Sequence, residues 1–204
     1  MFAYCLNNPI AFVDLFGYHA SYCFVHCDSE GGGGYITDQN DPAVAYKRFG
    51  LATISHSGCG IIASYNALIS MGNRKEFDEV LAYYNSEISN ILGYGLTGLL
   101  PSDVGSFFNY LGYTTVITMS PTAIKYLSKK ADACIMYYMF PRTYSLGALS
   151  IDAFGAHFVE YSRLGNQYIA RNTGGRNGTS SFSDPFAYGE QGSRYCVVGI
   201  FIFK

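Results

Sequence analysis

Cys59 lies between two glycines in Ser57-Gly58-Cys59-Gly60, directly ahead of an apolar run, residues 61–71, that predicts a buried helix. A thiolate at a helix N-terminus is stabilised by free backbone N–H groups and by the positive end of the helix dipole. Such a thiol therefore has a lowered pKa and is nucleophilic at neutral pH. The flanking glycines leave room for a substrate carbonyl to approach the sulfur. Taken alone, the motif also fits an inert, buried cysteine.

A nucleophilic cysteine needs a base, and the chain offers four histidines: His19, His26, His56 and His157. His157 begins an aromatic and β-branched run, residues 156–162, that predicts a strand able to hold the imidazole in place. His19 and His26 lie in linker-like sequence. His56 could reach the thiol, but no predicted strand holds it in place. Asn172 follows the next predicted strand, residues 167–171, so it is placed to orient the ring of His157.

The elements that must position these residues are predicted from the pattern of apolar residues. Helix signals cover residues 61–71 and 75–84, a segment opened by Pro101, and a segment that begins at Ser120-Pro121 and ends at Lys129-Lys130. Strand-like runs cover residues 113–119, 133–140, 156–162, 167–171 and 195–203. Because helices come first and strands mostly after, the sequence predicts an α+β fold with its helices on one side of an antiparallel sheet.

The first forty-odd residues differ from the rest of the chain. Residues 1–18 are predicted to be a remnant of another structure, and residues 19–44, which contain four consecutive glycines at 31–34, are predicted to be a linker. Residues 45–204 carry the pattern of a compact domain. The chain has 204 residues in all, enough for one or two domains.

The composition excludes several classes of protein and partner. Apolar residues make up 49% of the chain and charged residues 14%, which excludes an intrinsically disordered chain. The net charge of −2 gives no basic surface for a nucleic acid. There is no uninterrupted apolar stretch of about 18 residues, so no membrane span is predicted. The first residues lack the basic start of a signal peptide, so the localisation stays open and any export would need a carrier.

The other five cysteines are predicted to be bystanders, because a chain of this size does not need disulfides, although an even count of six leaves pairing open. Cys23 and Cys27, together with His19 and His26, have the residue types of zinc ligands. No second pair of ligands follows nearby. We therefore expect neither a metal nor a cofactor, with a zinc-stabilised N-terminal segment as the weaker alternative.

The segment Ile54-Ser55-His56-Ser57-Gly58-Cys59-Gly60-Ile61-Ile62-Ala63 resembles the start of papain-like cysteine peptidases, in the bacterial branch related to bacteriocin-processing peptidases. The resemblance covers residues 45–204. It implies a papain-like fold with the nucleophile helix first, Cys59 as nucleophile, His157 as base and acid, and Asn172 as the orienting residue. Thr53 stands where the family usually has an oxyanion-binding glutamine, so the backbone N–H of Cys59 would act with a second donor, Ser57 or Ser55.

The segment from Phe2 to Gly17, which contains Tyr4-Cys5-Leu6-Asn7-Asn8-Pro9, resembles the closing motif of RHS or YD-repeat cores, apart from Leu15 where that motif usually has proline. In such proteins the motif precedes a variable C-terminal domain, commonly a toxin. The resemblance implies that residues 45–204 are a toxin passenger, with an immunity protein as a possible partner.

Together these features predict a cysteine hydrolase that cleaves an amide or peptide bond in a protein or peptide through a thioester acyl-enzyme. The same residues could deamidate glutamine or transfer an acyl group to an amine. Thr173-Gly174-Gly175 follows Asn172 where many peptidase relatives have aspartate-proline. That departure favours, as a further alternative, a non-catalytic papain-like module that binds a peptide or an immunity protein.

Overall fold

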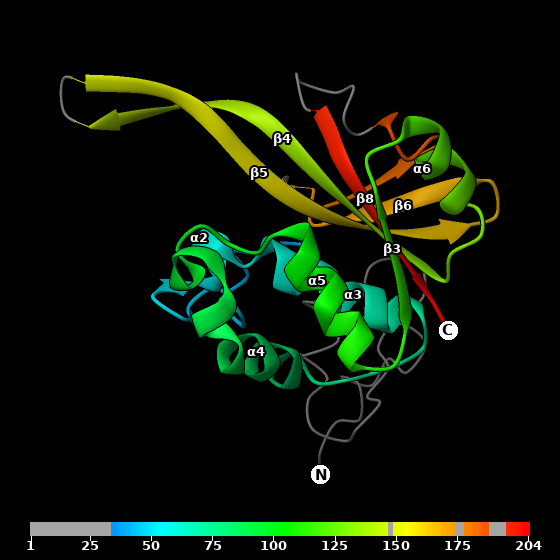
Figure 1. Cartoon of the computed structure of the whole chain (residues 1–204), viewed down its shortest axis with the longest axis horizontal. Helices are drawn as coiled ribbons and strands as arrows, with labels where there is room; N and C mark the ends of the chain where they lie inside the picture. The colour runs from blue at the N-terminus through cyan, green and yellow to red at the C-terminus, as the bar shows by residue number, and fades with distance from the viewer. Residues whose placement is uncertain (1–33, 147–148, 174–177, 188–194) are drawn as a thin grey trace, which may run out of the picture.

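The computed structural model of the chain describes residues 34–146, 149–173, 178–187 and 195–204 (Figure 1). The described residues form a mixed structure in which the helices mostly precede an antiparallel sheet, so the predicted α+β class is confirmed. The α-helices are α2 (Ile54–Ser57), α3 (Cys59–Ser70), α4 (Phe77–Ser86), α5 (Pro101–Tyr110) and α6 (Pro121–Leu127), with short 3-10 helices η2 (Ile88–Asn90) and η3 (Leu92–Gly95). The strands are β1 (Arg48–Phe49), β2 (Ala52–Thr53), β3 (Thr114–Thr118), β4 (Ala133–Leu146), β5 (Leu149–Leu164), β6 (Gln167–Arg171), β7 (Thr179–Phe182) and β8 (Tyr195–Phe203).

The main sheet has six strands in the order β3-β8-β4-β5-β6-β7, and every neighbouring pair is antiparallel. Strands β6 and β8 have the predicted bounds, whereas β4 and β5 run well past the predicted segments. Their hairpin projects beyond the other strands (Figure 1). Strand β7 was not predicted, because Thr-Ser-Ser-Phe is too short and too polar to give a strand signal.

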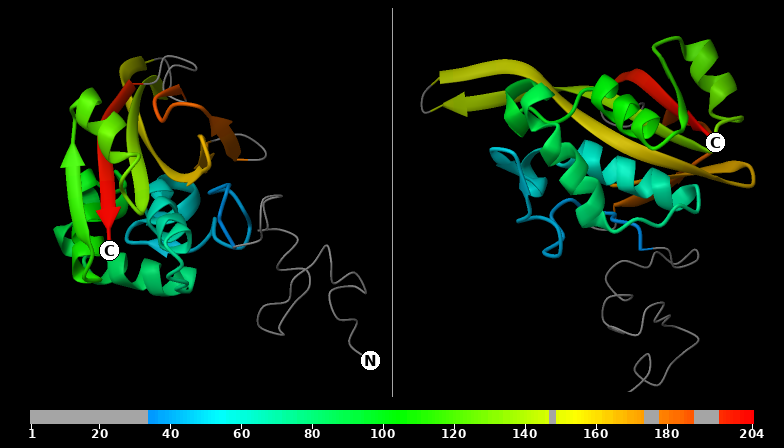
Figure 2. Two further views of the ribbon diagram at one scale, coloured as in Figure 1. Left: turned by 90° about the vertical axis from the view of Figure 1, so that its right-hand side faces the viewer. Right: turned by 60° about the horizontal axis from the view of Figure 1, so that its bottom comes forward.

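Helix α3 is the centre of the structure. It is buried on nearly all sides, and its apolar residues form one core cluster with α4, α5 and one face of the sheet. Figure 2 shows α3, α4 and α5 on the same side of the sheet. A helix enclosed in this way must be apolar around its whole circumference, which explains the sequence Ile-Ile-Ala that follows Cys59-Gly60. None of the helices in the described part of the chain has the length and apolar character needed to cross a bilayer.

Helix α6 departs from the prediction that all helices lie on one side of the sheet. Its Ile124 belongs to a second core cluster, which includes Met136 and Tyr138 of β4. Ile135, directly before Met136, belongs to the first cluster, and Tyr137, between Met136 and Tyr138, packs against that first cluster as well. Since successive side chains of a strand point to opposite faces, α6 covers the face opposite α3. Its short amphipathic sequence gave no information about which face it would cover.

Residues 34–44, assigned from the sequence to the end of the linker, pack against the domain. Ile36 and Val44 are buried in the main core cluster. The side-chain amide of Asn66 on α3 accepts a hydrogen bond from the backbone N–H of Ile36 (2.9 Å) and donates one to its carbonyl (2.8 Å). The compact domain therefore includes residues 34–44, because a buried amide replaces the backbone partner that an extended segment needs. The RHS-like motif at 1–18 and the rest of the predicted linker, 19–33, lie outside the described residues.

Candidate functional site

Cys59 is the first residue of α3, and Gly58 is the residue that caps the helix. A Cβ atom on Gly58 would lie 2.7 Å from the Cα and the carbonyl oxygen of Ile54. Only glycine fits at this position, and it allows α2 to continue into α3 with a single residue between them. Cys59 as a residue is half-buried at this position.

The pKa of the Cys59 thiol is below its ordinary value. Burial is the largest single influence and acts to raise the pKa. The hydrogen bond and the positive charge of His157 oppose it, together with hydrogen bonds from the backbone N–H groups of Phe158 and Gly60, and these outweigh burial. The structure thus brings Cys59 and His157, the two residues that the sequence paired, into hydrogen-bonding contact.

The ring of His157 also contacts the backbone carbonyl of Asn172, with 2.5 Å between Nε2 and the oxygen. A carbonyl oxygen can only accept, so Nε2 carries a proton and donates it. This leaves Nδ1 to face the sulfur of Cys59, as acceptor in the neutral ring and as donor in the imidazolium. Asn172 is therefore beside His157 as predicted from the hairpin, but the group that orients the ring is its main-chain carbonyl.

The backbone of Asn172 explains how that carbonyl is aimed. Asn172 follows the last residue of β6 and has φ = 63°, in the left-handed region that asparagine tolerates better than most residues. The left-handed turn ends the strand and directs the carbonyl towards β5. The amide side chain is buried and points to another partner, the backbone N–H of Gln39, from which its Oδ1 accepts a hydrogen bond of 3.3 Å.

Gln39 is a residue of the site that the sequence analysis missed. Its backbone N–H donates to the side chain of Asn172, and its own Nε2 donates to the carbonyl of Ser55 in α2 (2.8 Å). Gln39 Oε1 and Asn172 Nδ2 are both buried without a hydrogen-bond partner among the described residues, whereas most buried polar atoms of native proteins have one. Little in the sequence indicated this role, because Gln39 stands before the Asp41-Pro42 turn in the segment predicted to be a linker.

Ser57 was named from the sequence as a second oxyanion donor, with Ser55 as its alternative. Its side chain is buried, and its hydroxyl donates to the carbonyl of Gly95 (2.7 Å). The Ser55 hydroxyl lies 3.0 Å from that of Thr53. The backbone N–H of Cys59 stands in the first turn of α3, where N–H groups have no acceptor within the helix, and it is therefore available to a developing oxyanion.

Two aromatic side chains of the sheet, Tyr137 and Phe158, lie near Cys59. Tyr137 of β4 and Phe158 of β5 are paired in register, and their rings lie 4.8 Å apart. Cys59 and Tyr137 both pack against the main core cluster, and burial followed by the charge of Cys59 raises the pKa of the Tyr137 phenol. The sulfur thus lies between the start of α3 and an apolar part of the sheet.

The second cysteine with a free thiol in the described residues, Cys134, has the opposite character. It is buried in the cluster beneath α6, and burial followed by the charge of Glu160 raises its pKa far above the ordinary value. Cys5, Cys23, Cys27, His19 and His26 lie outside the described residues. Among the residues that are described, no group of three or more His, Cys, Asp or Glu side chains is placed to hold a metal ion.

No known family model matches this chain, and no curated protein sequence matches it either.

Proposed function

We propose that residues 34–204 form a papain-like cysteine hydrolase that cleaves an amide or peptide bond. The observation that carries the proposal is the hydrogen bond between Cys59, at the start of α3, and the imidazole of His157, which is itself held by the Asn172 carbonyl. In a cysteine with a purely structural role, burial in apolar surroundings raises the pKa of the thiol. Lowered thiol pKa values are instead typical of nucleophilic cysteines.

The reaction follows from the proton positions. The Cys59 thiolate attacks the substrate carbonyl carbon, a C–S bond forms, and the carbonyl π-electrons move to oxygen. The backbone N–H of Cys59 stabilises that oxyanion. His157 gives its Nδ1 proton to the leaving amine as the C–N bond breaks, which leaves a thioester. A water molecule then transfers a proton to His157 and attacks the thioester, releasing the acid and restoring the thiolate.

The papain-like resemblance and the RHS-like motif at residues 2–17 suggest a biological setting for this chemistry. The domain would be the passenger of a polymorphic toxin, with a protein or peptide substrate in the target cell and an immunity protein in the producer. Deamidation of glutamine and acyl transfer to an amine proceed through the same thioester. They differ only in the leaving group and in the acceptor, and so are outcomes of the same test.

The test compares the wild-type chain with Cys59→Ala and with Cys134→Ala, expressed in a susceptible bacterial host. We expect the wild type and Cys134→Ala to stop growth and Cys59→Ala to be harmless. Mass spectrometry of host proteins then distinguishes cleavage from a +1 Da deamidation or an added amine. Equal toxicity of the wild type and Cys59→Ala would refute the hydrolase and favour the non-catalytic binding module.

A further inference from the structure

A buried ion pair lies beside the candidate site. The guanidinium of Arg171 in β6 is 3.0 Å from a carboxylate oxygen of Glu160 in β5, and both side chains are almost fully enclosed (6% and 0% exposed). The two residues are direct register partners and form the last pair of the β5–β6 ladder. Glu160 stands three residues after His157, and Arg171 is immediately followed by Asn172.

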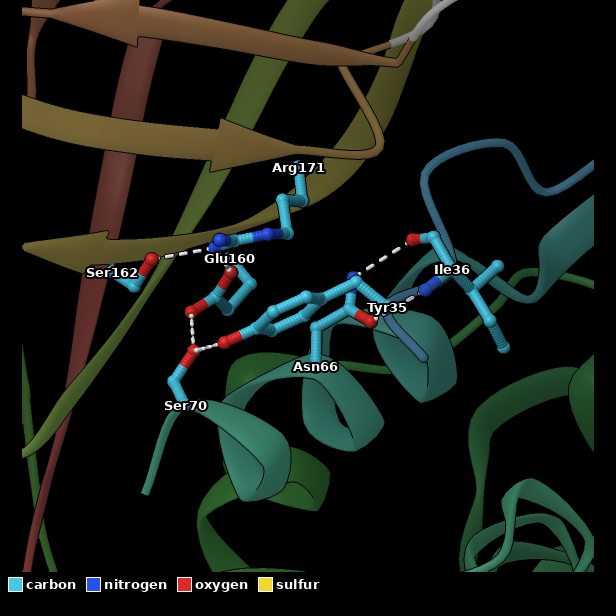
Figure 3. Close-up of polar contacts among 7 residues, drawn as sticks. All are labelled: Tyr35, Ile36, Asn66, Ser70, Glu160, Ser162 and Arg171. Carbon is cyan, nitrogen blue, oxygen red and sulfur yellow. Dashed lines mark hydrogen bonds and ion pairs between the residues drawn. The ribbon is translucent and has the colours of Figure 1, made fainter. Parts of the chain in front are cut away.

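Other polar groups surround the pair (Figure 3). The hydroxyl of Ser70, the last residue of α3, donates to the second carboxylate oxygen of Glu160 (2.5 Å). Arg171 donates to the hydroxyl of Ser162 (2.5 Å), and its guanidinium stacks 3.6 Å above the ring of Tyr35. The Tyr35 hydroxyl lies 3.3 Å from that of Ser70. Both oxygens of Glu160 are therefore engaged, as a buried carboxylate requires.

The same four segments supply the network and the candidate site. Helix α3 carries Cys59 at one end and Ser70 at the other, while β5 carries His157 and Glu160. The end of β6 supplies Arg171 and Asn172, and the segment after residue 33 supplies Tyr35 and Gln39. The network thus fixes, through directional contacts, the relative placement of the segments on which the site depends.

Stability alone does not account for this arrangement. Replacing a buried ion pair by apolar residues of similar volume is often neutral or stabilising, because two charges lose their hydration on burial. The hydrogen bonds between a carboxylate and a guanidinium are, in contrast, directional. The planar guanidinium of Arg171 is bound at its edge by Glu160 and Ser162 and at its face by the ring of Tyr35. An apolar pair would fill the same space without setting the angle between β5 and the turn at Asn172.

We propose that Glu160 and Arg171 are positioning residues, which hold the imidazole of His157 and the carbonyl of Asn172 in the geometry that activates Cys59. The inference rests on the proposed hydrolase function. Neither Glu160 nor Arg171 contacts the substrate in this proposal. Loss of the pair weakens the bond between His157 and Asn172, and with it the contact that stabilises the thiolate.

The experiment measures the rate of alkylation of Cys59 by iodoacetamide as a function of pH, in the full-length chain. The test variant is Glu160→Met/Arg171→Met, which removes both charges together and leaves neither one unpaired. The control is Asp78→Asn, which removes the exposed ion pair of Lys47 with Asp78 (2.7 Å). Among the described residues, the ionisable side chain that lowers the pKa of Cys59 is His157 of β5, and the phenol of Tyr137 in β4 is in turn affected by the charge of Cys59; neither residue is altered.

We expect the midpoint of alkylation to move to higher pH in the double variant and to stay in place in Asp78→Asn, with both proteins folded by circular dichroism. An unchanged midpoint in the folded double variant would overturn the inference. If the wild type itself titrates like an ordinary thiol, the proposed function fails as well. If the double variant does not fold, the same measurement is made on Ser70→Ala and Ser162→Ala, since each removes one hydroxyl that is hydrogen-bonded to the ion pair. An upward shift in them supports positioning, and wild-type midpoints in both refute it.

Discussion

Replacing His157 by alanine should raise the pKa of Cys59, and the structure gives the reason. Burial is the largest influence on this thiol and raises its pKa, and the two contributions of His157 head those that lower it. In His157→Ala only the N–H groups of Phe158 and Gly60 still oppose burial. The thiolate would then form only in more alkaline solution than in the wild type.

The expected loss of activity is large. A positioned general acid and base contributes about 10²- to 10⁴-fold to the rate of such reactions. Since each factor of ten in rate corresponds to about 1.4 kcal/mol of activation free energy, His157→Ala should raise the barrier to acylation by about 3 to 6 kcal/mol. The loss should shrink as the pH rises, because hydroxide then replaces the base and ionises the thiol.

The assay is alkylation of Cys59 with iodoacetamide across a pH series, followed by mass spectrometry of the peptide that contains it. Cys134 is an internal control in every sample, because burial and the charge of Glu160 raise its pKa and the folded protein should protect it. His56→Ala is the matched control, since His56 is exposed and stands three residues before the nucleophile. We expect the midpoint to rise in His157→Ala and to stay unchanged in His56→Ala.

The opposite pattern would refute the assignment of the base. If His56→Ala raised the midpoint and His157→Ala left it in place, the exposed histidine of α2 would be the activating group. If neither variant changed it, the low pKa of Cys59 would come from the start of α3 alone, and the imidazole of His157 would have no role in activation.

Three further predictions concern groups that support the site. Asn172→Gly should keep more activity than Asn172→Ala and be about 1 kcal/mol more stable in urea denaturation, because both keep the carbonyl that contacts His157 but only glycine adopts φ = 63° without strain. An equal loss of activity in both variants would mean that the amide side chain orients the ring. Gly58→Ala should lower stability by about 1 to 3 kcal/mol, because its Cβ would overlap the backbone of Ile54, and a wild-type denaturation midpoint would contradict this. Tyr84→Phe should cost about 1 kcal/mol through loss of the 2.7 Å hydrogen bond to Ser64, with alkylation of Cys59 unchanged; slower alkylation would show that this bond also supports the nucleophile.

Local patterns in the sequence predicted the elements that carry their own signal. The apolar run after Cys59 predicted α3, and the aromatic and β-branched runs predicted β6 and β8 with the right bounds. The missed features depend on contacts between distant residues. Strands β4 and β5 are prolonged by pairing with each other, and α6 is held on the far side of the sheet by Ile124 among residues of β4, β5 and β8.

The site shows the same limit at the level of single atoms. Residue types and hairpin spacing were enough to place Cys59, His157 and Asn172 together. They were not enough to show that the oxygen facing the imidazole belongs to the main chain of Asn172. That choice is made by one left-handed residue at the end of β6, and a backbone angle leaves almost no trace in a single sequence when the residue is asparagine.

Gln39 shows why a segment with linker-like composition belongs to the candidate active site. An extended segment can remain bound to a domain only if its backbone groups find partners, and residues 34–39 find theirs in the side chains of Asn66 and Asn172. Two buried amides therefore bind the segment, and one of them belongs to the residue that orients His157. Any force that removes the segment from α3 must break the contact between Gln39 and Asn172.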